Sequence, residues 1–316
     1  MTTKIILAAV LFTLLPACSV EGALDTDGET VSPDTAELQA VTPTTAMAQK
    51  EVDTSYLGGT GSCGTPFAIK VNEPVSGQHP VFIYLTGTWE PYNHPSALTA
   101  ISKMADLGFV AAAVQYDNNT WGDCNAFSSR AKCVFDKSTP KSAIEVLCSR
   151  DRADCSKGIV VAGFSQGSLL SMMGRNFDPR VRAVYGMGAG LNYSGTDVRA
   201  CVSPASRDLP NNRLRVVNGE QDSNFGGTED AQRSNFQQLT QLSCDGKPNG
   251  SNCFRDNDSG WFIVDHSMTS WGGADHCYMR QGGCNGGNNL DPKWAQGTYQ
   301  WSLGTNLQWL KTFTDP

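Results

Sequence analysis

Histidine, positive charge and long apolar runs are all scarce in this sequence, and each shortage argues against a class of function. The 24 lysines and arginines are outnumbered by 31 aspartates and glutamates, which gives a formal net charge of −7. Without a basic stripe to meet phosphates, we expect no nucleic acid as a partner. The sequence has four histidines and no Cys-x-x-Cys spacing, so a zinc site is not expected. The apolar run Ile5–Leu15 is too short to span a bilayer as a mature helix.

The N-terminus has the pattern of an exported protein. Lys4 precedes the apolar run, as in a signal peptide, and Leu15-Pro16-Ala17-Cys18 resembles a bacterial lipobox. We therefore expect a signal peptide over residues 1–17 and a diacylglycerol anchor on Cys18, which would attach the protein to a membrane. Pro16 is unusual in a lipobox, so ordinary signal-peptidase cleavage and secretion remain the alternative. Ser19 follows the cysteine as in outer-membrane lipoproteins, which predicts the bacterial cell envelope, at the outer membrane or cell surface.

Residues 18–55 differ in composition from the rest of the chain. Acidic residues stand among Thr, Ser, Pro and Ala, and no aromatic residue occurs there before Tyr56. Such a segment buries too little apolar area to offset its ordering entropy. We expect a disordered tether, with a helix around Ala36–Gln49 as the alternative. Residues 56–316 are long enough for one large α/β domain.

Ten cysteines beyond Cys18 indicate disulfide bonds and an oxidising compartment. Four pairs are close in the sequence, and two distant cysteines are left over. The expected bonds are Cys124–Cys133, Cys148–Cys155, Cys244–Cys253, Cys277–Cys284 and Cys63–Cys201. Spacing does not prove connectivity, so this pairing is a hypothesis.

Apolar, β-rich segments alternate with segments of helical spacing. We expect strands over Phe67–Val71, Val81–Leu85, Phe109–Val114, Val181–Met187, Leu214–Val217 and Trp261–Val264, with one more before Ser165. We expect helices over Ser96–Leu107, Lys141–Cys148, Ser168–Arg175, Glu229–Leu242 and Trp294–Phe313. The polar segment Asp117–Thr139 is expected to be a disulfide-stapled loop. This order predicts an α/β fold with a mostly parallel sheet covered on both faces.

One strand leads directly into Gly163-Phe164-Ser165-Gln166-Gly167. A strand-to-helix corner this sharp forces its central residue into a strained backbone, and the flanking glycines avoid collisions. The corner would raise the Ser165 hydroxyl above the sheet and direct the Gln166 backbone N–H at the group attacked. A structural turn is the alternative, but the strand before and the helix after favour a nucleophile.

These features together resemble the α/β-hydrolase superfamily over residues 56–316. The elbow itself is similar to the Gly-Tyr-Ser-Gln-Gly elbow of cutinases, although this chain is longer and its acid loop lacks their Asp-x-x-Cys pattern. The resemblance implies an α/β-hydrolase fold with a mostly parallel central sheet and helices on both faces, and the cysteines add the expectation of disulfide-stapled loops. It also implies the chain order nucleophile, acid, histidine.

That order indicates partners for the serine, whose hydroxyl needs an imidazole to accept its proton. A histidine after the last strand leaves two candidates. Glycines before His276 and a cysteine after it favour His276, with His266 as the alternative. Asp222 follows the penultimate expected strand in a Gly-x-x-Asp turn and is expected to orient the histidine, with Glu220 as its substitute.

The oxyanion hole is expected from two backbone amides. The loop Thr86-Gly87-Thr88-Trp89 stands where many relatives have His-Gly-x. We expect the N–H of Thr88, paired with that of Gln166, to stabilise a developing oxyanion. Trp89 is the alternative to Thr88.

The substrate is less well defined than the reaction. Five aromatic residues in expected loops could line a cleft for a sugar, an aromatic ester or a polymer, or could cover the core: Trp89, Tyr92, Trp121, Trp271 and Tyr278. The insertions Asp117–Thr139 and Leu191–Asn212 are expected to be lids or surface loops. The sequence therefore predicts an extracytoplasmic serine hydrolase that cleaves small-molecule or polymeric carboxylic esters through an acyl-enzyme, with no metal and no organic cofactor. A serine peptidase, an acyltransferase and a non-catalytic surface binding protein are the alternatives.

Overall fold

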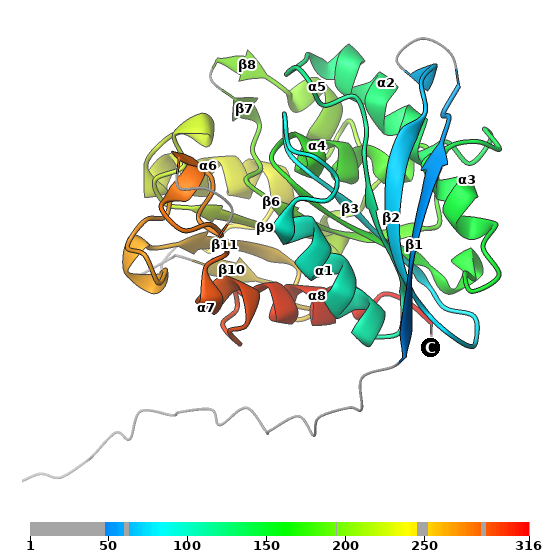
Figure 1. Ribbon diagram of the computed structural model, residues 1–316. Helices are drawn as coiled ribbons and strands as arrows, with labels where there is room; N and C mark the ends of the chain where they lie inside the picture. The colour runs from blue at the N-terminus through cyan, green and yellow to red at the C-terminus, as the bar shows by residue number, and fades with distance from the viewer. Residues whose placement is uncertain (1–47, 60–62, 194, 245–251, 286–288, 316) are drawn as a thin grey trace, which may run out of the picture. The chain divides into compact units, whose positions relative to one another are not determined.

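A sheet of nine strands organises the fold (Figure 1). The computed structural model describes residues 48–59, 63–193, 195–244, 252–285 and 289–315, so the expected signal peptide, Cys18 and the tether up to residue 47 lie outside the described residues. In spatial order the strands are β1 (Gln49–Tyr56), β2 (Phe67–Pro74), β4 (Val110–Val114), β3 (Val81–Leu85), β5 (Ile159–Phe164), β6 (Val181–Met187), β9 (Leu214–Gly219), β11 (Gly260–Val264) and β10 (Asn252–Phe254). The pairings from β4 to β11 are parallel. The β1–β2, β2–β4 and β10–β11 pairings at the two edges are antiparallel.

The central strands are apolar throughout because both of their faces are covered. Successive side chains of a strand point to opposite faces of the sheet. In β3, Ile83 and Leu85 therefore belong to one buried apolar cluster, and Phe82 and Tyr84 belong to a second cluster on the other face. This explains the continuous apolar run that the sequence shows at this strand.

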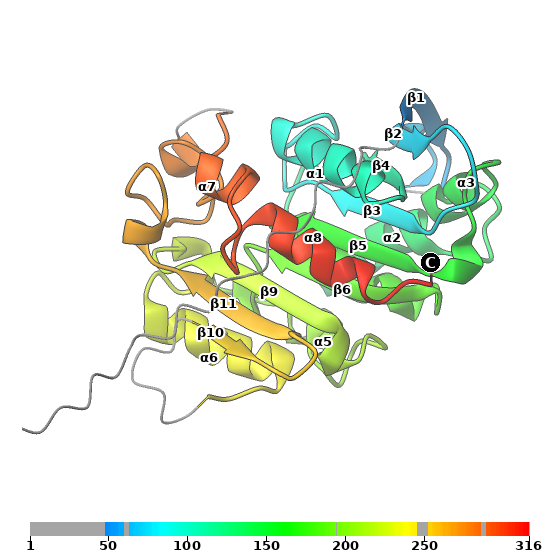
Figure 2. The same cartoon turned by 90° about the horizontal axis from the view of Figure 1, so that it is seen from below.

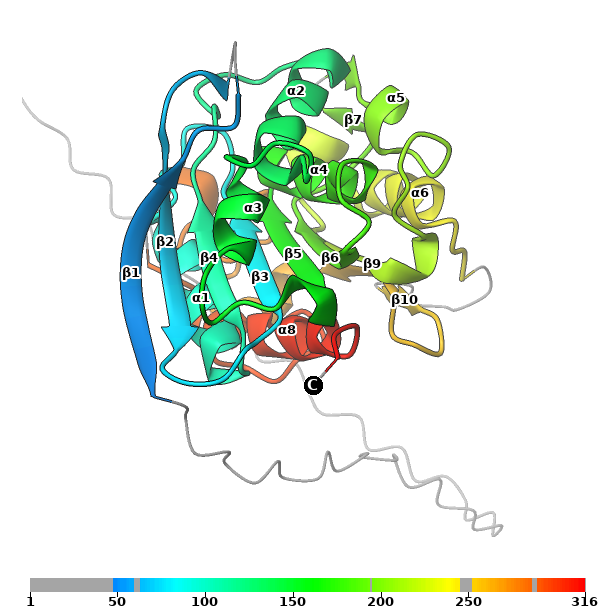
Figure 3. The ribbon, with the colours of Figure 1, turned by 90° about the vertical axis from the view of Figure 1, so that its right-hand side faces the viewer.

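Helices lie on both faces of the sheet, as Figures 2 and 3 show from two directions. The face that carries Phe82 is covered by α1 (Pro95–Asp106), α7 (Pro292–Ala295) and α8 (Leu303–Lys311). The opposite face is covered by α2 (Cys124–Phe135), α3 (Ala143–Cys148), α4 (Gln166–Met173), α5 (Arg199–Val202) and α6 (Glu229–Thr240). Within the described ranges, no helix is long and apolar enough to cross a membrane. The predicted mostly parallel sheet with helices on both faces is confirmed.

The predicted boundary of the folded domain at residue 56 is wrong. Gln49–Tyr56 forms the edge strand β1, which pairs along its whole length with β2. Its charged residues Lys50, Glu51 and Asp53 are exposed beside the partly buried Val52 and are acceptable at a sheet edge, where they oppose edge-to-edge association. The low apolar content of this segment therefore reflects an edge strand rather than disorder.

Two other predicted elements need correction. The C-terminal segment Trp294–Phe313 is not one helix, because α7 ends after Ala295 and α8 begins at Leu303. Ser302 precedes α8 and its hydroxyl bonds to the Lys293 carbonyl oxygen, which holds the connection between the two helices. The insertion 191–212 contains the short strands β7 (Asn192–Tyr193) and β8 (Thr196–Asp197) as well as α5.

The segment Asp117–Thr139 is not an internally stapled loop, because it contains α2 with a cysteine at its first position and another near its end. Nine residues of α-helix separate Cα atoms by about 13 Å, whereas a disulfide requires less than about 7 Å. The predicted Cys124–Cys133 bond is therefore wrong, and the predicted Cys63–Cys201 bond is wrong with it. The structure contains Cys63–Cys133 and Cys124–Cys201, with Cα–Cα distances of 5.4 and 5.3 Å.

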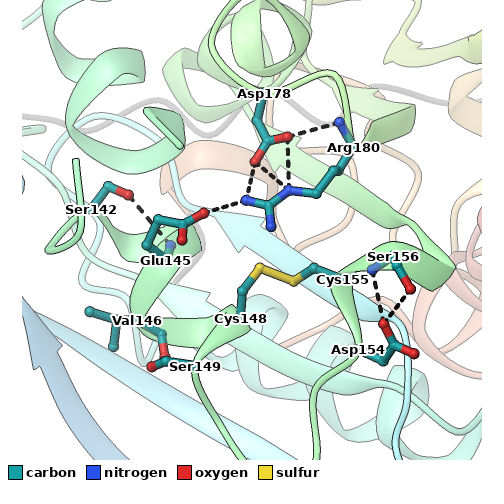
Figure 4. Close-up of a disulfide and its surroundings, with 10 residues drawn as sticks. All are labelled: Ser142, Glu145, Val146, Cys148, Ser149, Asp154, Cys155, Ser156, Asp178 and Arg180. Atoms are coloured by element: carbon teal, nitrogen blue, oxygen red, sulfur yellow. Dashed lines mark hydrogen bonds and ion pairs between the residues drawn. A yellow bond between two sulfur atoms is a disulfide. The ribbon is translucent and has the colours of Figure 1, made fainter. Parts of the chain in front are cut away.

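The other three predicted disulfides are confirmed: Cys148–Cys155, Cys244–Cys253 and Cys277–Cys284. The first of them joins the end of α3 to the turn before β5 (Figure 4). Close to it, Arg180 forms ion pairs with Asp178 and Glu145, and the hydrogen bonds that its guanidinium donates to Asp178 are the main reason that the pKa of the guanidinium is raised. These contacts anchor the start of β5, the strand that leads into Ser165.

Candidate active site

Ser165 occupies a sharp corner between β5 and α4. Its backbone lies at φ 53° and ψ −121°, a left-handed conformation that is strained for a residue with a side chain. The corner is tight on both sides. A Cβ on Gly163 would overlap the Gly167 carbonyl, and one on Gly167 would overlap the Leu85 and Thr86 carbonyl oxygens. The two glycines of the Gly-x-Ser-x-Gly pattern are thus required by close backbone contacts.

The structure brings Ser165, His276 and Asp222 into one hydrogen-bonded chain. His276 Nε2 lies 2.9 Å from Ser165 Oγ, and His276 Nδ1 lies 2.8 Å from Asp222 Oδ2. Because a carboxylate only accepts, Nδ1 carries the proton and Nε2 is free to accept from the serine hydroxyl. Asp222 is fully buried, while Ser165 and His276 keep 6% and 7% of their surface exposed. The arrangement can remove a proton from the serine during attack on an electrophile.

Each partner comes from the loop after a strand on the same edge of the sheet. Asp222 lies three residues beyond the end of β9, and its carboxylate also accepts from the Asn224 backbone N–H at 3.0 Å. The backbone N–H of Gln221 donates to the Ala274 carbonyl oxygen at 2.8 Å, which ties the acid loop to the histidine loop. The Cys277–Cys284 disulfide bond closes a short loop that begins directly after His276.

The alternative histidine and the alternative acid are bonded to each other instead. His266 Nδ1 hydrogen-bonds to Glu220 Oε1, and the His266 side chain is about half exposed. The hydrogen bond that Glu220 accepts from His266 raises the pKa of His266 above its ordinary value, and the negative charge of Asp265 adds to this effect. The structure therefore places this pair outside the Ser165 chain.

Glu220, Asp265 and His266 also offer ligand atoms that lie within 4.8 Å of one another. Among the described residues, these three side chains lie close enough together to hold a metal ion. They sit at the surface, and two of them already satisfy each other. We assign no chemistry to them.

The backbone N–H groups of Thr88 and Gln166 lie near Ser165 and have no acceptor within the described residues. Thr88 is the second residue of a turn closed by the Glu90 N–H donating to the Gly87 carbonyl oxygen at 3.2 Å. The N–H of Trp89, the alternative donor, is occupied because it donates to the Asn118 carbonyl oxygen at 2.9 Å. The geometry thus leaves Thr88 and Gln166 free to donate to an oxyanion, and leaves Trp89 committed elsewhere.

A buried ion pair holds this turn against the histidine loop. Glu90 Oε2 accepts from the Gly87 N–H at 2.9 Å, and Glu90 Oε1 pairs with Arg280. The side chains of Glu90 and Arg280 are only 12% and 11% exposed. The Arg280 guanidinium also lies over the Phe164 ring, 5.4 Å from its centroid. The pair therefore connects the turn of Thr88 to the loop that bears His276.

We expect Arg280→Met to lower the free energy of unfolding by about 3 kcal/mol, because it leaves Glu90 as an unpaired buried carboxylate. Glu90→Gln in the same background should recover part of the loss. A double-mutant cycle by urea denaturation with intact disulfides measures this coupling. Additive single-variant effects would show that the pair contributes nothing as a pair.

The predicted aromatic residues separate into different roles. Tyr278 is fully buried and belongs to the core, whereas Trp89 is 78% exposed and strained at φ 62°. Trp121 stacks on Tyr193 with ring centroids 3.8 Å apart. Tyr193 then contacts Phe225, whose ring lies 5.9 Å from that of His276. A row of aromatic rings therefore runs from Trp121 to the histidine, and the sequence pattern does not reveal two of its members.

Several residues of the site carry no local sequence signal. Glu90 and Arg280 are far apart in the chain, and neither belongs to a recognisable motif. Arg130 on α2 contacts the Gln166 side chain, and it lay in a segment predicted to be a loop. Only the folded chain shows these contacts.

Comparisons with known proteins support the fold. No family model and no curated protein matches the sequence. Among solved structures, the chain is similar to a dienelactone hydrolase-like promiscuous phosphotriesterase from metagenomic libraries, with 14% identity and a TM-score of 0.52. It is also similar to a protein described as m3DLH, with 15% identity and a TM-score of 0.50. Each match covers 85% of this chain and 100% of the other.

At such low identity these similarities bear on the architecture alone. The mostly parallel sheet and the helices on both faces agree with them. The predicted fold class is confirmed: the chain has an α/β-hydrolase fold.

Proposed function

We propose that the protein is a serine hydrolase that cleaves carboxylic esters through an acyl-enzyme on Ser165. The observation that most supports this is the buried chain from Ser165 through His276 to Asp222, built on a strained corner. Strain of this kind is retained where it serves a function. The solved structures of the same fold include a dienelactone hydrolase-like enzyme, which agrees with ester chemistry.

In the first half of the proposed reaction, the Ser165 oxygen attacks the ester carbonyl while His276 Nε2 takes the hydroxyl proton. Asp222 holds the imidazole in the required tautomer and stabilises the imidazolium that forms. The carbonyl oxygen becomes negative and accepts hydrogen bonds from the free N–H groups of Thr88 and Gln166. The carbon–oxygen bond to the alcohol then breaks, and the alcohol leaves with the proton from His276.

Water completes the cycle. His276 takes a proton from water as it attacks the acyl-serine, and returns that proton to Ser165 when the acid leaves. No step requires a group other than these residues and water.

The setting of the enzyme follows partly from its cysteines. Five disulfide bonds indicate an extracytoplasmic protein. Attachment to a membrane through acylated Cys18 is our proposal from the lipobox pattern alone. We also propose that the aromatic row from Trp121 to Phe225 contributes to binding a small-molecule or polymeric ester.

A fluorophosphonate probe tests the proposal directly, because it labels an activated serine and spares an inert one. We expect labelling of the purified protein and none of Ser165→Ala, which should unfold within a few degrees of the wild type. An ester panel with matched amides and alcohol acceptors then separates esterase from peptidase and acyltransferase activity. A folded wild-type protein that does not label, or equal labelling of Ser165→Ala, would rule out the proposed function.

A further inference from the structure

The side chain of Gln166 is fully buried and satisfied at both ends. Its Oε1 accepts from Arg130 Nη1 at 3.2 Å, and its Nε2 donates to Thr88 Oγ1 at 3.1 Å and to the Thr120 carbonyl oxygen at 2.9 Å. A guanidinium has donors only. A rotated amide would face the guanidinium of Arg130 with its own donors and the Thr120 carbonyl with its oxygen. Arg130 and the Thr120 carbonyl oxygen together therefore determine which way the Gln166 amide points.

The orientation of that amide matters because of Thr88. The Gln166 side chain reaches the hydroxyl of Thr88, so it connects the two residues whose free backbone N–H groups are expected to bind the oxyanion. Oxyanion donors are effective only when they are held in place before charge develops. A hydrogen-bonded line thus runs from Arg130 through Gln166 to Thr88.

Arg130 is itself held firmly. It lies on α2 between Cys124 and Cys133, and each of these cysteines is bonded to a distant part of the chain. Its guanidinium also donates to the carbonyl oxygen and to the hydroxyl of Thr120, both at 3.0 Å. Arg130 is 6% exposed.

Two other arginines, Arg207 and Arg215, are equally buried and bond mainly to backbone carbonyls. A buried cation is therefore not in itself a sign of function in this chain. What distinguishes Arg130 is its contact with a residue of the site. Arg207 has the same burial without such a contact, and it supplies a matched control.

We propose that Arg130 is a positioning residue for the oxyanion hole: it orients the Gln166 amide, which in turn fixes Thr88. The proposal rests on the proposed ester hydrolysis at Ser165. Arg130 does not contact the reacting atoms, so its loss should act on the transition state and not on binding of the ground state.

Kinetics of Arg130→Met with a chromogenic ester tests the proposal. We expect kcat to fall about 10- to 100-fold, somewhat less than the loss of a whole oxyanion donor, while KM stays within about threefold. The inhibition constant of a boronic acid that mimics the tetrahedral state should rise by a similar factor. Arg130→Lys keeps a donor toward Gln166 and should recover most of the activity.

Thr88→Val provides a second test that leaves the buried cation in place. It removes the hydroxyl that accepts from Gln166 but keeps the backbone N–H, so it should show the same fall in kcat. Thr88→Ser, which keeps the hydroxyl, should retain clearly more of kcat than Thr88→Val. The comparison of Thr88→Val with Thr88→Ser tests the proposal even if Arg130→Met fails to fold.

The outcomes separate cleanly. Arg207→Met should lose stability while keeping kcat within about threefold of the wild type. Equal kcat losses in Arg130→Met and Arg207→Met, or a raised KM with unchanged kcat, overturn the positioning role. Failure of the wild-type protein to label with fluorophosphonate overturns the proposed hydrolase function instead, whatever the variants do.

Discussion

Replacing His276 with glutamine is expected to lower kcat/KM for ester hydrolysis by about 10⁵- to 10⁶-fold. Glutamine is close in size to histidine, and its amide can still bond to Asp222, so the buried position tolerates it. It has no group that accepts a proton from Ser165, and an unassisted hydroxyl is a poor nucleophile. Initial rates with a chromogenic ester, combined with thermal unfolding of each variant, measure the effect.

His266→Gln is the matched control for this prediction, because both histidines lie in the connection between β11 and α7 and only His276 reaches the serine. His266 is half exposed and bonded to Glu220, so its loss should leave kcat/KM within about threefold of the wild type. Comparable losses in both variants would point to a general disturbance of the loops. Normal turnover in His276→Gln would remove His276 from the mechanism.

Replacing Asp222 with asparagine is expected to lower kcat by about 10⁴-fold while the fold persists. Asparagine keeps one oxygen that can accept from the Asn224 N–H, so the local turn is preserved. Its NH₂ group donates where the carboxylate accepted, which favours the tautomer with the proton on Nε2 of His276. That nitrogen then cannot accept from Ser165. Kinetics and near-UV circular dichroism together check both halves of the prediction.

Glu220→Gln is the control for Asp222→Asn. Glu220 lies two positions before Asp222, and both substitutions replace a carboxylate with a neutral amide. The hydrogen bond of Glu220 raises the pKa of His266, so the substitution should lower that pKa toward its ordinary value without a large change in turnover. An NMR titration of the histidine ring protons reads the shift. A large loss of activity in Glu220→Gln, with Asp222→Asn unaffected, would exchange the roles of the two acids.

The position of Ser165 could be predicted because the constraint on it is local. Gly163 and Gly167 are needed by contacts within a single corner, so five consecutive residues contain the whole signal. Asp222 and His276 were harder to predict, since each has a chemically equivalent neighbour nearby in the chain. The structure separates the pairs by distance, placing His276 against Ser165 and His266 against Glu220.

The parts that sequence reasoning missed depend on contacts between distant segments. Strand β1 looks disordered by composition because an edge strand has only one face to bury, and charged residues are acceptable on the other. Glu90 and Arg280 form an ion pair although 190 positions separate them in the sequence. Arg130 contacts Gln166, which lies 36 positions further along the chain. The prediction of a Cys124–Cys133 disulfide was wrong for a related reason. The two cysteines are close in the sequence, but helix α2 holds them too far apart to bond.

The two disulfides of α2 overlap along the chain, with residue 63 bonded to 133 and residue 124 bonded to 201. A polypeptide entering an oxidising compartment from its N-terminus exposes Cys63 and Cys124 together before Cys133 arrives. Oxidation in order of emergence would join the wrong partners, and native pairing then requires thiol–disulfide exchange through mixed disulfides. We therefore expect a production host that supplies a disulfide-exchange catalyst as well as an oxidant to give more natively paired protein.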